Sequence, residues 1–226
     1  GDGMLYCIPG QIFTLSGVED FTDLKDLYAF HQPLTDVGGV DVNQNLALER
    51  IDFQWTGFTS IDISNLSNLW NFLKSGIISG CAAITPADVN TLTSITLPTA
   101  GVLRQLMITW QPITNSSLIN LNLQTSLENL YLEGNTGLTT LDLSNSTALQ
   151  ILHVQNCSLT SLTLGNDIDL AYLAGNETNG LKRFKATGND ANLIIHVGNA
   201  AGRVALAQSL FTVANGSFST GTTIAI

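Results

Sequence analysis

The sequence predicts a mostly β fold, a single solenoid domain of about eight similar turns. Two observations carry this prediction. One template repeats with a period of 21 to 22 residues from Leu127 to Leu170, and a second apolar triplet falls between successive copies. A repeat of this length is one supersecondary unit, which buries its apolar row only by stacking on its neighbours.

The first half of each turn is predicted to be a short strand, which we call the first leg. Apolar residues return at positions 1, 4 and 6 of the template, as in Leu127, Leu130 and Leu132. Other first legs are predicted to begin at Leu24, Leu48, Leu69, Leu103, Leu149 and, more weakly, Leu170. Because side chains alternate along a strand, positions 3, 5 and 7 are expected to face solvent.

The second half of each turn is predicted to be another short strand, the second leg. Its apolar triplets are Phe58, Ile61 and Ile63; Leu92, Ile95 and Leu97; Leu118, Leu121 and Leu123; Leu138, Leu141 and Leu143; and Leu159, Leu162 and Leu164. About ten residues per half-turn leave no room for a helix of typical length. A last strand of the repeat region is predicted around Leu193.

Residues 1–226 are predicted to form one domain, with an N-terminal cap over 1–23, repeats over 24–198 and a C-terminal cap over 199–226. Residues 4–8 and 11–15 suggest short strands around the Pro9-Gly10 turn, and TTIAI at the end of the chain predicts a final strand. Insertions after Ile77 and Gln111 lengthen two turns. Both follow a first leg, so both are expected to emerge along the same edge, or lip, of the solenoid.

The segment LENLYLEGN, with Leu127, Leu130, Leu132 and Asn135, matches an LxxLxLxxN signature outright. In this it resembles the leucine-rich-repeat family, and its period is similar to the short repeats of internalin-type bacterial surface proteins. The resemblance implies a right-handed curved solenoid, of the α/β class by family convention, with a parallel sheet on its concave face. It further implies protein recognition, a secreted or cell-surface location and no common catalytic activity. Position 9 is clearly asparagine only at Asn135.

The composition argues against several classes of partner. Eight Lys and Arg against eighteen Asp and Glu give a formal charge of −10, which repels nucleic acid and anionic lipid surfaces. No stretch approaches the roughly 18 apolar residues of a membrane span. Cys7, Cys81 and Cys157 provide neither a closed disulfide framework nor a metal clip, and Cys157 is expected in the core. We expect a monomer.

Catalytic patterns are missing from the sequence. There is no GxSxG, no phosphate loop and no dinucleotide fingerprint, and the three histidines are scattered. Asp52 and Glu133 are predicted to lie roughly 14 Å apart by strand spacing, too far for a glycosidase pair. Lys182, Arg183 and Lys185 are predicted on a second leg as a solvated stripe. The sequence therefore predicts a protein that is not an enzyme, without catalytic residues, cofactor or metal.

Positions 5 and 7 of the first legs, and position 8, which flanks the end of the strand, carry the candidate partner-binding residues. These are Tyr28, Phe30, Trp55, Met107, Trp110, Tyr131, Glu133 and His153. Aromatic side chains mixed with polar ones are typical of binding hot spots, so we predict recognition of a protein or peptide. Two alternatives stay open: a carbohydrate-binding adhesin that uses the same aromatic residues, and a structural spacer of a surface protein. The tryptophans could also be covered by the long loops, as Trp is well buried on average.

Overall fold

Short parallel strands make up almost all of the regular structure in the computed structural model. The structure describes residues 12–32, 34, 40–76, 90–165, 181, 183–198, 204 and 223–225. Two short 3₁₀ helices, η1 (Val18–Asp20) and η2 (Leu121–Leu123), interrupt the strands, and Val204 is helical as well. The prediction of a mostly β protein with parallel sheets is confirmed.

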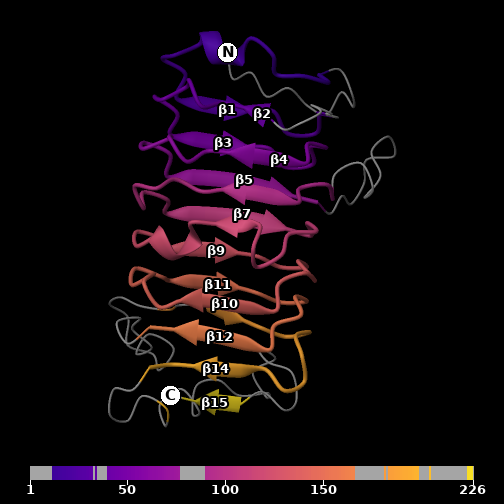
Figure 1. Ribbon diagram of the computed structural model, residues 1–226, viewed down its shortest axis with the longest axis vertical. Helices are drawn as coiled ribbons and strands as arrows, with labels where there is room; N and C mark the ends of the chain where they lie inside the picture. Colours follow the sequence, from indigo (N-terminus) through magenta and orange to yellow (C-terminus); the bar gives the residue numbers. More distant parts are fainter. Residues whose placement is uncertain are drawn as a thin grey trace.

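The chain alternates between two layers as it advances. One layer is a seven-stranded sheet in the order β1 (Asp26–Tyr28), β3 (Arg50–Asp52), β5 (Asn71–Ser75), β7 (Gln105–Thr109), β9 (Asn129–Tyr131), β11 (Ile151–His153) and β13 (Arg183–Lys185). The strands follow one another along the long axis of the molecule (Figure 1). Every described pairing in this sheet is parallel and joins consecutive first legs.

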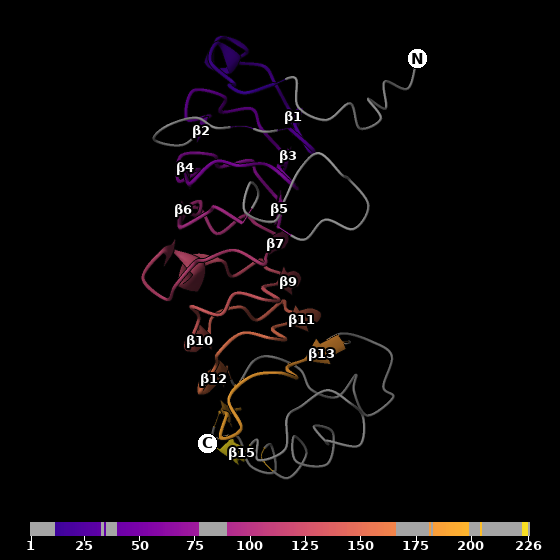
Figure 2. The same cartoon turned by 90° about the vertical axis from the view of Figure 1, so that its right-hand side faces the viewer.

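The other layer consists of two four-stranded sheets. The first is β2 (Val40–Asp41), β4 (Ser60–Asp62), β6 (Ser94–Thr96) and β8 (Leu118–Ile119). The second is β10 (Thr140–Leu143), β12 (Ser161–Leu164), β14 (Ile194–His196) and β15 (Thr223–Ala225), which includes the predicted final strand. Figure 2 shows this layer along one side of the molecule and β1 to β13 along the other.

The apolar rows of the two layers meet and form the core. Leu127, Leu130 and Leu132 are fully buried, as the template predicts. On the second legs, Phe58, Ile63 and Leu162 are also fully buried. Each such side chain contributes about 1.5 to 3 kcal/mol of hydrophobic stabilisation relative to an exposed one.

Leu123 departs from the predicted second-leg pattern because it is 40% exposed. Asn120 adopts a left-handed conformation, and helix η2 follows it, so the extended alternation is lost at this turn. Gln124 points inward instead and donates hydrogen bonds to the carbonyls of Pro98 (2.6 Å) and Asn120 (3.0 Å). The buried amide thus takes the place predicted for a leucine.

The N-terminal cap differs in part from the prediction. Residues 12–15 of the expected second strand form no strand, and a turn leads from them into η1. The expected strand at residues 4–8, the insertion after Ile77 and most of the C-terminal cap lie outside the described residues.

Strand β13 is a first leg, and this corrects one prediction. Arg183 and Lys185 pair in register with Ile151 and His153 of β11, so they belong to the seven-stranded sheet and not to a second leg. The first leg expected at Leu170 lies outside the described residues, whereas Leu181, Phe184 and Ala186 are buried at positions 1, 4 and 6. The strand around Leu193 is the second leg β14, which pairs with β12.

Two asparagines, the buried Asn135 and the half-buried Asn189, close the corners that follow first legs. Asn135 Nδ2 donates to the carbonyls of Ile108 (2.6 Å) and Leu132 (2.7 Å), and its Oδ1 accepts from Gln111 N (2.8 Å). Asn189 repeats the arrangement with Val154 O, Ala186 O and Leu159 N. Position 9 is therefore asparagine twice, and each side chain ties its own turn to the preceding turn.

Other turns use different residues at this corner. Thr56 Oγ1 donates to Phe53 O at 2.6 Å, and Cys157 Sγ donates to Leu132 O at 3.1 Å. Cys157 lies in the core as predicted, and burial raises the pKa of its thiol to about 11. A thiol in this state is a weak hydrogen-bond donor and an inert core group.

Lys74 occupies position 6 of its first leg, where the template has an apolar residue. The side chain is fully buried, and its Nζ donates to Thr56 O at 2.6 Å and lies 5.3 Å from the centroid of the Phe58 ring. Burial lowers the pKa of Lys74 to about 7. The core therefore holds an amine that is only partly charged at neutral pH.

Candidate partner-binding surface

One face of the seven-stranded sheet points away from the core, and we call it the outer face. Side chains at position 5 of each first leg form one column across it. In register order these are Tyr28, Asp52, Leu73, Met107, Tyr131, His153 and Lys185. Tyr28 is 53% exposed, and the next five are half-buried, so the column forms a continuous accessible surface.

The parallel ladder continues past the strands to position 8. The amides of His31, Trp55 and Trp110 donate to the carbonyls of Gln54 (3.0 Å), Ser75 (2.9 Å) and Glu133 (2.8 Å) in the following turns. Gly134 and Asn156 continue the pattern with Gln155 and Thr187. Position 8 is thus a second aligned column, along one lip of the outer face.

Position 8 requires an unusual backbone conformation. Gly134, Asn156 and Gly188 have φ values of 76°, 52° and 73°, in the left-handed region that glycine and asparagine tolerate best. His31, Trp55 and Trp110 adopt the same region, with φ of 59°, 57° and 57°. The left-handed conformation costs a bulky residue about 1 to 2 kcal/mol. Three large aromatic side chains therefore stand where the backbone favours small ones.

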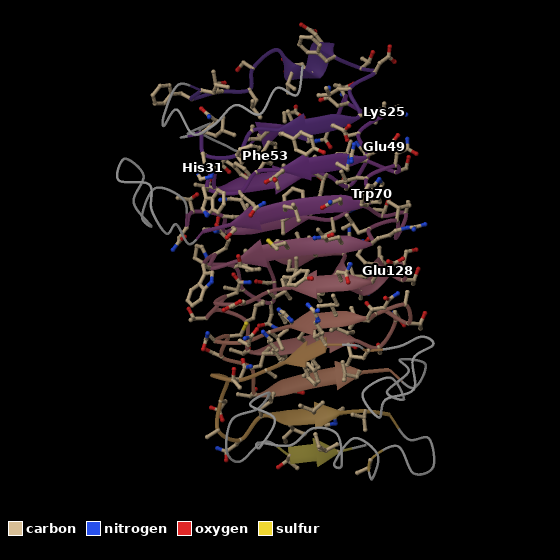
Figure 3. The ribbon with its side chains drawn as sticks, turned by 180° about the vertical axis from the view of Figure 1, so that it is seen from behind. Lys25, His31, Glu49, Phe53, Trp70 and Glu128 are labelled. Carbon is tan, nitrogen blue, oxygen red and sulfur yellow. The ribbon has the colours of Figure 1, made fainter. Side chains whose placement is uncertain are left out.

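The aromatic residues near β1 and β3 form one contact group. The rings of His31 and Trp55 lie 4.0 Å apart at their centroids, and Phe30 meets His31 edge-on at 5.7 Å. Figure 3 places His31 at one end of the strands, with Lys25, Glu49, Trp70 and Glu128 along the opposite edge. The N-terminal part of the lip is therefore a packed aromatic cluster.

The remaining predicted residues gather over β7, β9 and β11. Tyr131 and His153 contact each other edge-on at 5.0 Å, and Met107 is in register with Tyr131. Trp110 covers Gly134: a Cβ added to this glycine would fall 2.2 Å from the indole ring. Glu133, which is half-buried, accepts the Trp110 amide with its carbonyl. The eight predicted residues therefore form two groups on one face, with β5 between them.

Charge is distributed unevenly along the outer face. Burial raises the pKa of Asp52, against the effect of its hydrogen bonds from Gln54. At the other end of the sheet, burial lowers the pKa of His153, and the positive charges of Lys185 and Arg183 lower it further. His153 is therefore neutral at physiological pH, beside the two exposed cations of β13.

Sequence reasoning missed three residues of this surface. His31 was outside the predicted set although it stacks on Trp55. Arg183 and Lys185 were assigned to a second leg, but the spacing of Leu181, Phe184, Ala186 and Asn189 matches the first-leg template with its position-9 asparagine. That spacing was the signal that could have placed both cations on the outer face.

Two side-chain polar atoms on this face are buried from solvent and make no hydrogen bond. Within the described residues, His153 Nε2 and Gln155 Oε1 have no hydrogen-bond partner. The described residues also contain no group of three His, Cys, Asp or Glu side chains that could hold a metal ion. The arrangement offers aromatic contact area and hydrogen-bonding groups to a binding partner.

Comparison of the chain with known proteins finds no matching family model, no matching curated protein and no matching solved structure. Among the residues described by the structure, no helix has the length and apolar character needed to cross a membrane.

Proposed function

We propose that the chain is a right-handed leucine-rich-repeat solenoid of about eight turns, capped at both ends, with the seven-stranded sheet on its concave side. The template period, the alternation of strands between layers and the corners built on Asn135 and Asn189 support this assignment. In such a solenoid, neighbouring turns present equivalent positions as columns on one extended surface. These columns are suited to binding an elongated partner.

We further propose that the protein is a non-enzymatic recognition module that binds a protein or peptide through the outer face and its position-8 lip. The left-handed conformations of Trp55 and Trp110 carry this proposal. Residues in strained backbone conformations cluster at functional sites, where the surrounding structure holds them against the backbone cost. Both indoles are half-buried and lie at the lip, so they retain surface for contact with a partner.

The composition of the surface favours a polypeptide partner. Tyr, Trp and Met are enriched in protein interfaces, and Tyr and Trp supply many of the residues with the largest binding energies. The polar Glu133 and Gln155 lie beside them. The cations of β13 at one end favour an acidic segment of the partner there. By resemblance to the bacterial surface repeats, the proposed location is secreted or at the cell surface.

A random-peptide library selected on the immobilised chain, without counter-selection, provides ligands for a test. We expect the double variant Trp110→Ala, Tyr131→Ala to bind the selected peptides at least tenfold more weakly, on the order of 1.4 kcal/mol. Calorimetric titration measures the affinity, and a thermal melt checks that the variant is folded.

A matched control removes exposed apolar area from the other layer. Ile119 and Leu123 are 42% and 40% exposed on β8 and η2. The double variant Ile119→Ala, Leu123→Ala should bind the peptides as the parent does. Parent-like affinity of the Trp110 and Tyr131 variant, or loss of affinity in the control alone, would count against the outer face as the binding surface.

A further inference from the structure

A separate hollow lies at the edge of the seven-stranded sheet where the first legs begin. It has a volume of about 890 Å³ and is lined by residues that precede or start β5, β7 and β9, among them Trp70, Arg104, Gln105, Glu128 and Asn129. Figure 3 shows Trp70 and Glu128 along this edge, opposite His31. The volume falls within the range of small-ligand sites, about 300 to 1,000 Å³.

The indole of Trp70 is held in place at the hollow. The Arg50 guanidinium lies 5.9 Å from the centre of the Trp70 ring, and Arg50 is itself bonded to Asp26 at 2.5 and 2.7 Å. Trp70 remains half-buried, so part of its apolar surface is accessible in the hollow. A fixed and partly exposed indole can receive the flat face of a ligand with little loss of side-chain entropy.

The backbone at this edge is already occupied by hydrogen bonds between turns. The amides of Arg104 and Gln105 both donate to Trp70 O, at 2.9 and 3.0 Å. Those of Glu128 and Asn129 both donate to Arg104 O, at 2.9 Å each. Because these amides are engaged, an extended peptide cannot pair with them as an added strand, so recognition in the hollow relies on side chains.

Those side chains are mostly neutral amides and hydroxyls. Gln105 and Asn129 are half-buried, and Asn68, Ser67, Thr125 and Ser126 complete the polar lining. The two charged residues, Arg104 and Glu128, offset each other at 3.8 Å. A lining without net charge, in a chain of net charge −10, provides no attraction for an anion.

We propose that this hollow binds a neutral saccharide, with a sugar ring packed on Trp70 and its hydroxyls bonded to the surrounding amides. A pyranose ring has an apolar C–H face, which gains dispersion contacts on an indole, and a rim of hydroxyls that both donate and accept. Asn and Gln side chains, which offer both a donor and an acceptor, complement these hydroxyls. This site lies at the edge opposite the position-8 lip, and it shares with the outer face only the position-3 residues Gln105 and Asn129.

The test uses the full chain and soluble neutral tetrasaccharides built from glucose, mannose, galactose or N-acetylglucosamine, with sialyllactose as an anionic comparison. We expect at least one neutral tetrasaccharide to bind with a dissociation constant in the millimolar range or below, and sialyllactose to bind more weakly. Saturation-transfer NMR detects binding, and titration gives the affinity.

Trp70→Ala should weaken this binding at least tenfold, whereas Trp110→Ala, at the opposite edge, should leave it unchanged. Asn129→Ala, which keeps the indole, should weaken it at least threefold, and this variant decides the question if Trp70→Ala fails to fold. Absence of neutral-saccharide binding at tens of millimolar overturns the proposal, as does parent-like binding by both Trp70→Ala and Asn129→Ala. Peptide binding measured on Trp70→Ala, whose indole lies at the edge opposite the position-8 lip, reports separately on the peptide-binding surface.

Discussion

Leu130→Asp is expected to abolish cooperative folding or to lower the free energy of unfolding by more than about 4 kcal/mol. Leu130 is fully buried at the centre of β9, between β7 and β11. A carboxylate there loses its hydration, and a protonated carboxyl still requires hydrogen-bond partners. Urea unfolding followed by circular dichroism measures the effect.

The control places the same group one residue earlier in the same strand. Asn129 is half-buried and its side chain lies on the other face of β9, so Asn129→Asp should cost less than about 1 kcal/mol. Similar stabilities for Leu130→Asp and Asn129→Asp would mean that the inward and outward faces of the first leg have been assigned wrongly.

Lys74→Met is expected to change stability in a pH-dependent manner. The pKa of Lys74 is about 7 in the folded chain, against 10.5 for an unperturbed lysine. Below pH 7 both states bind the proton, and the parent bears the full cost of a buried ammonium. Between pH 7 and about 10.5 only the unfolded state binds it, so the parent becomes more stable as the pH rises.

Met lacks the charge and fills a similar volume, so Lys74→Met should be more stable than the parent at pH 6. This advantage should shrink and then reverse by pH 9, because the neutral amine of the parent can still donate to Thr56 O. Thermal melts of the variant and the parent at each pH give the difference between their stabilities. Groups other than Lys74 titrate alike in both chains, so their contributions cancel in this difference. A difference that stays constant from pH 6 to 9 would contradict a depressed pKa at Lys74.

Lys25→Met is the matched control for this measurement. Lys25 is an exposed lysine whose ammonium bonds to Glu49 at 2.9 Å, and this partner raises its pKa. Both of its states are therefore protonated throughout the window from pH 6 to 9. The stability difference between Lys25→Met and the parent should be the same at every pH in that window.

The repeat itself was predictable because apolar residues return at regular spacing along the sequence. Leu127, Leu130 and Leu132 recur at the positions that stacking must bury, so strand order and core followed from the period. The composition misled at β13, where Lys182, Arg183 and Lys185 suggest a solvated face although the apolar spacing is that of a first leg. In that strand only Phe184 points inward, and two charged side chains flank it on the outer face.

Two other features depended on tertiary context. Lys74 stands where an apolar residue is expected because its long stem can be buried while Nζ reaches Thr56 O and the Phe58 ring. The aromatic lip was predicted in composition, but the left-handed backbone at Trp55 and Trp110 was not, since nothing in the local sequence favours it. The hollow beside Trp70 is lined by residues from successive turns, so no single segment of the sequence predicts it.

A photo-crosslinker placed on either layer tests most directly whether the outer face of the seven-stranded sheet binds the partner. One variant carries p-benzoylphenylalanine in place of Tyr131, in the middle of the outer face, and a second carries it in place of Ile119 on β8. Each is irradiated with a peptide from the unbiased library, and the products are mapped by mass spectrometry. We expect crosslinks from position 131 and few from position 119, whereas equal crosslinking at both positions, or crosslinking at 119 alone, would contradict the proposal.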